Sequence, residues 1–256
     1  MAEWTWAPDD FAALWYSEAN DRFPNPLHYR SRFPLRDAFA AHRLAVRARY
    51  SRDEFEHIQL AMRTLTNSDL RIEILGGTTK HKAGDGTVKI YRMVGARTPE
   101  HAVTLFQSAT TDQDGPIRLR TGRPETLAID LARAIPACPP GTHESSTFHP
   151  EDLRPRRDTY FEDVARSTPR ERYERLVHRP ADGGGSAGLL TGPINILSEP
   201  RHILRWRDIT DDGRYTEIHG PHITVRPTTP ADLAATFATW ISRTLEHLCG
   251  SEEYTS

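Results

Sequence analysis

A glycine-rich pentapeptide is the sharpest candidate for catalytic chemistry in this sequence. Gly184–Gly188 fits the pattern G-x-S-x-G, in which the central serine acts as a nucleophile. That chemistry needs a strand before the serine and a helix after it, so that a sharp turn exposes the hydroxyl group. The flanking residues of Arg179–Gly192 are rich in glycine and suit neither element. We therefore predict a flexible loop here, and a hydrolase with Ser186 as its nucleophile is the alternative.

A serine nucleophile also needs an acid and a base, and Asp208 with His219 or His222 keeps a suitable order along the chain. These residues lie in segments that read as ordinary strands and turns. The twelve histidines are scattered, and the sequence has neither an HExxH pair nor the paired cysteines of a zinc site. It also lacks a P-loop and a Rossmann fingerprint. We predict that the chain is not an enzyme and holds no metal or cofactor.

Composition narrows the classes of partner. The chain has 256 residues, a formal net charge of −2 and 27% charged residues, which indicates a globular protein that is not drawn to nucleic acid. No apolar run is long enough to span a membrane, and the N-terminus does not read as a signal peptide. The two cysteines, Cys138 and Cys249, fit a reducing compartment. A cytoplasmic location is therefore expected.

Hydrophobic periodicity, capping residues and turn signals predict the secondary structure. Helices are expected at Pro8–Asn20, at Leu35–Arg49, from Ser51, from Pro124 to about Pro136, after Thr168, and from Thr229 to about Cys249. Strands are expected at Leu27–Ser31, Leu70–Leu75, Val88–Gly95, Ala102–Gln107, Ile117–Arg120, His202–Ile209, Arg214–His219 and Ile223–Arg226. Short links between most strands favour antiparallel pairing. The charged segment Asp158–His178 interleaves arginines with acids, which favours a solvated helical face over a phosphate site.

Two stretches of the chain are built alike. Gly115–Ile135 and Gly220–Ile241 each begin with Gly-Pro, continue as a short alternating strand, and end in a helix that opens with proline. The similarity favours an α+β fold of a single domain, residues 1–256, with two related halves at about 8–136 and 155–249. Convergence on one way of capping a helix is the alternative explanation.

Several spaced motifs together resemble the EspG family, from residue 11 to about residue 248. The matching segments are Phe11-x-x-Leu14-Trp15, Arg22–Leu27 with Ser31, Asp69–Ile74, Gly95-Ala96 with Gln107, Ile135-Pro136 with Pro139–Gly141, Ile203-x-x-Trp206-x-Asp208, Asp212–Tyr215, and Ile223–Pro227 with Leu233. The segment Gly184–Ser198 departs from the family pattern. The resemblance implies a central, largely antiparallel sheet flanked by two helical bundles, with quasi-twofold halves.

The resemblance also implies a function. EspG proteins are cytoplasmic chaperones of type VII (ESX) secretion in actinobacteria, and they do no catalysis. They bind the hydrophobic helical tip of a PPE protein within a PE–PPE pair and keep it soluble until export. The expected partner of this chain is thus a PPE-like protein or a similar helical secreted substrate. A generic protein-binding domain that has drifted from chaperone work is a further alternative.

By the same resemblance, the partner-binding groove is formed by the loop between the second and third strands and by the C-terminal helical bundle. In this sequence the loop is Gly76–Thr87, and its candidate contacts are Thr78, Lys80, His81, Lys82 and Asp85. The candidate contacts of the bundle are Phe237, Trp240, Ile241 and Leu245. An ordinary surface loop and a plain hydrophobic core are the alternatives for the two sets.

Overall fold

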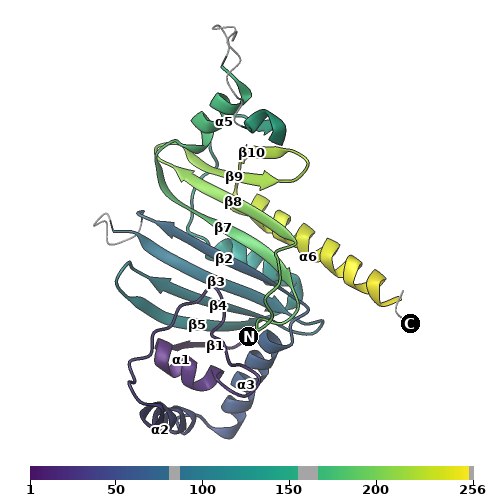
Figure 1. Cartoon of the computed structure of the whole chain (residues 1–256). Coiled ribbons are helices and arrows are strands. Elements are labelled where there is room, and N and C mark those ends of the chain that lie inside the picture. Colours follow the sequence, from purple (N-terminus) through teal and green to yellow (C-terminus); the bar gives the residue numbers. More distant parts are fainter. Residues whose placement is uncertain (81–86, 155–166, 254–256) are drawn as a thin grey trace.

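One ten-stranded sheet dominates the computed structural model, which describes residues 1–80, 87–154 and 167–253 (Figure 1). Its strands are β1 (Glu3–Trp6), β2 (Leu70–Thr78), β3 (Lys89–Arg97), β4 (Ala102–Ala109), β5 (Asp114–Gly122), β6 (Ser146–Phe148), β7 (Ala181–Thr191), β8 (His202–Ile209), β9 (Gly213–His219) and β10 (Ile223–Pro227). The helices are α1 (Pro8–Trp15), α2 (Arg36–Arg47), α3 (Arg52–Thr66), η1 (Pro124–Thr126), α4 (Leu127–Ala134), η2 (Pro150–Leu153), α5 (Pro169–Val177) and α6 (Pro230–Glu253).

The strand order has the same plan on both sides of the sheet centre. It runs β1-β5-β4-β3-β2-β7-β8-β9-β10-β6, and the pairs of neighbouring strands are antiparallel. Each side is a four-stranded meander with an extra edge strand, and the two sides join where β2 pairs with β7. The similar stretches Gly115–Ile135 and Gly220–Ile241 supply the last strand of each meander and the helix after it. The predicted boundaries of the halves stay a prediction, and β1 and β6 lie outside them.

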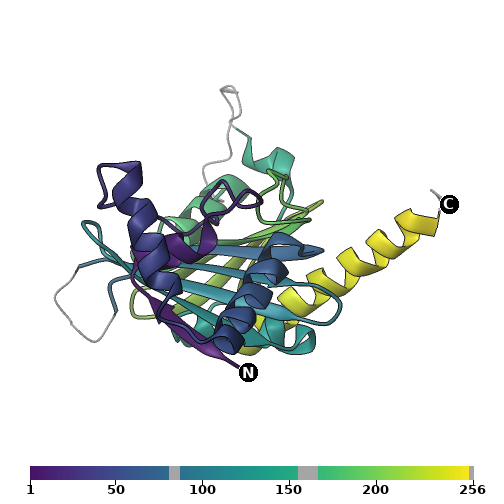
Figure 2. The ribbon, with the colours of Figure 1, turned by 90° about the horizontal axis from the view of Figure 1, so that it is seen from below.

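Helices cover the two faces of the sheet unequally. Helices α4 and α6 pack together on one face, where their side chains share a core with inward residues such as Ile72, Met93 and Trp206. Helices α1 and α3 cover the other face beside β1 and β3–β5, through residues such as Val94 and Leu105. Helix α5 lies on that same face at the far end, over β8–β10 and β6 (Figure 2). The sheet alternation that separates Met93 from Val94 thus creates two distinct cores.

Local signals in the sequence account for most element boundaries. Ser51 caps α3 by accepting the N–H of Glu54, and Thr168 and Glu171 form a complete capping box at α5. Thr229 and Asp232 cap α6 in the same way. The α+β class, the antiparallel sheet and all the predicted helices are confirmed, and so is every predicted strand except Leu27–Ser31.

The predicted strand at Leu27–Ser31 is wrong, because this segment has no partner strand among the described residues. His28 is instead held by Gln107, whose side chain accepts the His28 N–H at 2.8 Å and donates to its carbonyl at 2.7 Å. The edge position on that side belongs to β1, which pairs with β5. Its four residues carry too short an alternation to stand out in a sequence window.

The predicted loop at Arg179–Gly192 is also wrong, because most of it forms β7 in the centre of the sheet. Strand β2 likewise continues through Gly76 and Gly77 to Thr78, into the segment predicted as loop. Gly76 and Gly185 face each other in the β2–β7 register, with Tyr91 beside the first and Trp206 beside the second. The two aromatic rings lie over the glycines, and this packing needs positions without a Cβ atom.

Candidate functional site

Ser186 does not lie at a strand-to-helix turn. It occupies the middle of β7, opposite Leu75 of β2 and Arg205 of β8, and the strand continues to Thr191. No helix follows it, so the sharp turn that would present a nucleophilic hydroxyl is not formed.

The acid and base that could accompany a serine nucleophile are engaged elsewhere. Asp208 forms a buried ion pair with Arg214, at 2.7 Å from its Nε. The imidazole of His219 contacts the Glu217 carboxylate. Within the described part of the chain, no hydrogen bond joins Ser186 to a histidine. The three groups do not form a triad in this arrangement, which favours a structural role for the serine.

We expect the substitution Ser186→Ala to leave the protein unchanged. The side chain is only half-buried and makes no hydrogen bond with any residue that the structure describes, so the free energy of unfolding should shift by less than about 0.5 kcal/mol. Thermal melts and hydrolysis of p-nitrophenyl acetate by both proteins check this. A hydrolytic activity that the wild-type chain has and the alanine variant lacks would contradict it.

The thiols and acids offer no metal site in the described ranges. No group of three or more histidine, cysteine, aspartate or glutamate side chains is close enough there to hold an ion. Cys138 and Cys249 are not joined in a disulfide. Burial raises the pKa of the Cys138 thiol to about 11, so this cysteine is a poor nucleophile at neutral pH.

Two of the predicted loop contacts lie at the end of β2. Thr78 is buried, and its hydroxyl accepts the N–H of Lys80 at 3.1 Å. Lys80 is exposed, and its Nζ lies 2.6 Å from Oδ2 of Asp182. The hydrogen bond to Asp182 raises the pKa of Lys80, and Lys80 and Thr210 together lower the pKa of Asp182. The other candidates, His81, Lys82 and Asp85, lie outside the described residues.

Asp182 is a residue that sequence reasoning missed. It lies 102 positions after Lys80 in the chain, and only the pairing of β2 with β7 brings the two together. The Thr79 backbone N–H also donates to the Asp182 carbonyl at 2.7 Å. No local signal in the sequence indicates this contact, because it depends on the register of a glycine-rich strand that reads as a loop.

The predicted contacts on α6 form one apolar stripe along the helix. Phe237, Trp240 and Ile241 are buried in the core shared with α4 and the sheet. Trp240 stacks on His202 with ring centroids 5.4 Å apart. Leu245 is only partly buried, and one turn later Leu248 is also half-exposed. The first three side chains therefore build the core, and their contact with a partner stays a prediction.

The far end of α6 projects away from the body of the molecule (Figures 1 and 2). The apolar stripe continues toward the C-terminal end of the helix through Leu245, which packs against the core, and Leu248, which is half-exposed. A half-exposed apolar stripe on a projecting helix is typical of a surface that contacts another protein. This geometry makes the end of α6 the strongest candidate interaction surface on the α4–α6 face.

The hairpin β8–β9 carries the sequence signature Trp206-x-Asp208 with Asp212–Tyr215, and its residues hold the fold together. Trp206 is buried in the core, and Asp208 and Arg214 form their ion pair beside it. Asp212 accepts hydrogen bonds from Thr142, Tyr215 and Arg179. Partial burial alone would raise the pKa of Asp212, but these donors hold it well below its usual range. The signature is therefore structural.

Comparison with known proteins agrees with this architecture. A family model described as the EspG family matches residues 7–238, which is nearly the whole chain. No curated protein matches the chain. In the described part of the chain, no helix is both long and hydrophobic enough to cross a bilayer. The chain belongs to the EspG family of chaperones associated with type VII secretion.

Proposed function

We propose that this protein is a cytoplasmic chaperone that binds the hydrophobic helical tip of a PPE-like substrate and keeps it soluble for export. The supporting observation is the apolar stripe of α6, which continues toward the projecting C-terminal end of the helix. The family match over residues 7–238 supports the association with type VII secretion. A helical tip with exposed apolar residues aggregates unless another surface covers it.

The physical basis of the proposed contact is helix packing. Leu245 and Leu248 lie at i and i+3 on α6, so they form part of one ridge that a helix of the substrate can pack against. The buried residues Phe237, Trp240 and Ile241 hold the first half of α6 firmly on α4 and the sheet. The binding surface is therefore preorganised, and substrate binding does not have to order the helix first.

The loop between β2 and β3 is the second part of the proposed surface. Thr78 and Lys80 stand at its base, and we assign His81, Lys82 and Asp85 to the same role from the sequence. Asp182 partly neutralises Lys80 and fixes its position. Such a charged loop adds orientation and selectivity to the apolar contact on α6.

The double substitution Leu245→Glu with Leu248→Glu tests the α6 contact. It places two carboxylates on the stripe that the substrate would cover, so we expect co-purification of helical substrates from the native cytoplasm to fall by about tenfold or more. Leu248→Glu alone serves as a milder second variant, since Leu245 also packs against the core. Pull-down followed by mass spectrometry measures both.

The matched control is Ala235→Glu with Thr239→Glu, two exposed positions on the side of the same helix that faces away from Leu245 and Leu248. We expect this control to co-purify the substrate as the wild type does. The proposed function would be contradicted if the wild-type chain captured no helical secreted protein. Equal capture by the leucine and control variants would instead rule out the α6 stripe as the contact.

A further inference from the structure

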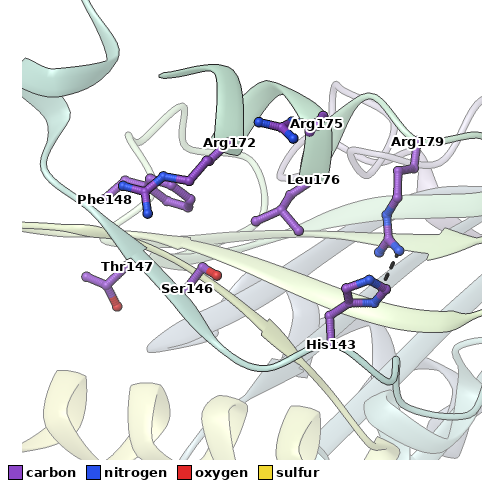
Figure 3. A pocket seen from close by; sticks show the side chains of 8 residues that line it. All are labelled: His143, Ser146, Thr147, Phe148, Arg172, Arg175, Leu176 and Arg179. Carbon is purple, nitrogen blue, oxygen red and sulfur yellow. Dashed lines mark hydrogen bonds between the residues drawn. The ribbon is translucent and has the colours of Figure 1, made fainter. Parts of the chain in front are cut away.

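A groove on the other face of the sheet lies between helix α5 and the edge strand β6 (Figure 3). It encloses about 710 Å³. Its walls are basic and its floor is partly apolar, and the lining residues are His143, Ser146, Thr147, Phe148, Arg172, Arg175, Leu176 and Arg179. Trp206 points to the α4–α6 face, whereas Ile209, three residues along the same strand, packs under α5. The groove is therefore on the face opposite α6.

Three arginines form one row along the groove. Arg172 and Arg175 lie one turn apart on α5, and Arg179 follows two residues after the helix ends. Arg179 is fixed by Asp212, whose Oδ2 lies 2.6 Å from Nη1, and by the ring of Tyr215 beneath it. Arg172 and Arg175 are exposed, and neither makes an ion pair or hydrogen bond with any residue that the structure describes.

The acidic residues of α5 do not neutralise these two arginines. The Glu171 carboxylate accepts the N–H of Thr168 in the capping box at 3.0 Å. Glu174 pairs with Arg170 at 2.8 Å. Glu171 lies one turn before Arg175 on α5, but the two interleaved acids make their contacts with the capping box and with Arg170. Among the residues that the structure describes, Arg172 and Arg175 are left as two cations without an ion-pair partner over the groove.

The other wall of the groove is an edge of the sheet. Strand β6 is the last strand in the order of the described strands, and its residues Ser146–Phe148 pair there with β10 on one side only. Side chains of successive strand residues point to opposite faces. A groove lined by all three successive residues therefore runs along the edge of the strand, where backbone N–H and C=O groups are available to a further strand.

We propose that this groove binds an extended acidic segment of a partner protein. The segment adds a strand to β6, and its carboxylates pair with Arg172 and Arg175. Alternate side chains of an extended chain are roughly 6–7 Å apart, and residues one turn apart on a helix rise about 4.5 Å, a mismatch that flexible arginine side chains span. Phe148 and Leu176 cover the apolar side of the bound segment.

A second copy of this chain fits the groove less well. A symmetric β6–β6 pair would place the cationic row of one copy next to the same row of the other copy, and like charges repel. The three residues of β6 would also give a very short ladder. Because the groove and α6 lie on opposite faces, the acidic segment and the helical substrate can bind at the same time.

The first test is fluorescence anisotropy of the full-length chain with a labelled, end-capped peptide of alternating glutamate and threonine, in low-salt buffer. We expect saturable binding that weakens by about tenfold or more in Arg172→Glu with Arg175→Glu, and less strongly in Arg172→Gln with Arg175→Gln. Arg36→Glu with Arg63→Glu is the charge-matched control and should bind as the wild type does, because both arginines are exposed on α2 and α3 and make no ion pair with any residue that the structure describes.

The second test is hydrogen exchange of the same complex. Amides of Ser146–Phe148 should become protected when the peptide is added, while those of α6 should not change. The proposal is overturned if the glutamate peptide does not bind, if its binding is insensitive to the paired Arg172 and Arg175 substitutions, or if a lysine–threonine peptide binds equally well. Binding without protection of β6 would overturn the strand addition.

Discussion

Replacing Asp208 with leucine is expected to lower the free energy of unfolding by about 3–5 kcal/mol, a large share of the about 5–15 kcal/mol typical of a folded domain. The substitution leaves the Arg214 guanidinium, whose side chain is 1% exposed, without its carboxylate. Two hydrogen bonds are lost, from Nε at 2.7 Å and from Nη2 at 2.8 Å. Urea unfolding followed by circular dichroism measures the loss.

The double variant Asp208→Leu with Arg214→Met is the control for this prediction. Removing both charges leaves no buried ion unpaired, so most of the lost stability should return. A small deficit should remain, because Nη2 of Arg214 also donates to the carbonyl of Pro136 at 2.9 Å. If the double variant is as unstable as Asp208→Leu, the loss comes from packing and the electrostatic explanation is wrong.

The backbone of Arg214 explains why this ion pair matters to the whole chain. Its N–H donates to the carbonyl of Pro139, and its own carbonyl accepts the N–H groups of Gly141 and Thr228. These bonds attach the segment that leaves α4 and the segment that enters α6 to the same point of β9. Breaking the ion pair would therefore loosen the connection between the two sides of the sheet. It would also loosen the attachment of α6, which carries the proposed substrate surface.

The regular elements could be predicted because their signals are local. Helix α3 begins at the Ser51 cap, α5 begins at the Thr168 capping box, and the alternation at Leu70–Leu75 marks β2. Each signal depends on residues that are close together in the sequence, so it can be recognised without knowledge of the tertiary structure. The same holds for the similar strand–helix units, which supply β5 with α4 and β10 with α6.

Strand β7 could not be predicted, because its stability comes from its neighbours. Four of its eleven residues are glycine, and glycine weakens an isolated strand. In the structure β2 and β8 supply hydrogen bonds on both sides, and the rings of Tyr91 and Trp206 fill the space above the glycines. No pattern within the segment itself indicates that aromatic rings from other strands pack against its glycines.

The candidate site was predictable in part for the same reason. The apolar periodicity of α6 identifies Phe237, Trp240, Ile241 and Leu245 as one stripe, but periodicity alone does not say where the core ends. Only the position of α4 and the sheet divides the stripe into a buried part and a half-exposed part. The pair Lys80–Asp182 likewise depends on the strand register.

Replacing Gly185 with alanine is the second substitution expected to have a large effect. A Cβ atom at this position would lie 2.5 Å from Cζ2 of Trp206, 2.7 Å from the carbonyl oxygen of Leu75 and 2.9 Å from Cα of Gly76. The last two atoms belong to the backbone of β2, so the strand pair at the centre of the sheet would have to separate. We expect destabilisation of about 3 kcal/mol, at the upper end of overpacking costs.

Gly188→Ala is the matched control, because Gly188 lies on the same strand and a Cβ atom there would make only ordinary contacts, at 3.4 Å from Cβ of Pro200 and 3.8 Å from the carbonyl oxygen of His202. There the added methyl group has room, and the loss of flexibility in the unfolded chain should leave stability unchanged or raise it by up to about 1 kcal/mol. Urea unfolding of both variants makes the comparison. Similar losses at the two positions would mean that β7 needs glycine for backbone reasons alone. A large loss at Gly185 only would show that the aromatic rings and the β2–β7 contact set the glycine requirement, and that this contact holds the two halves of the sheet together.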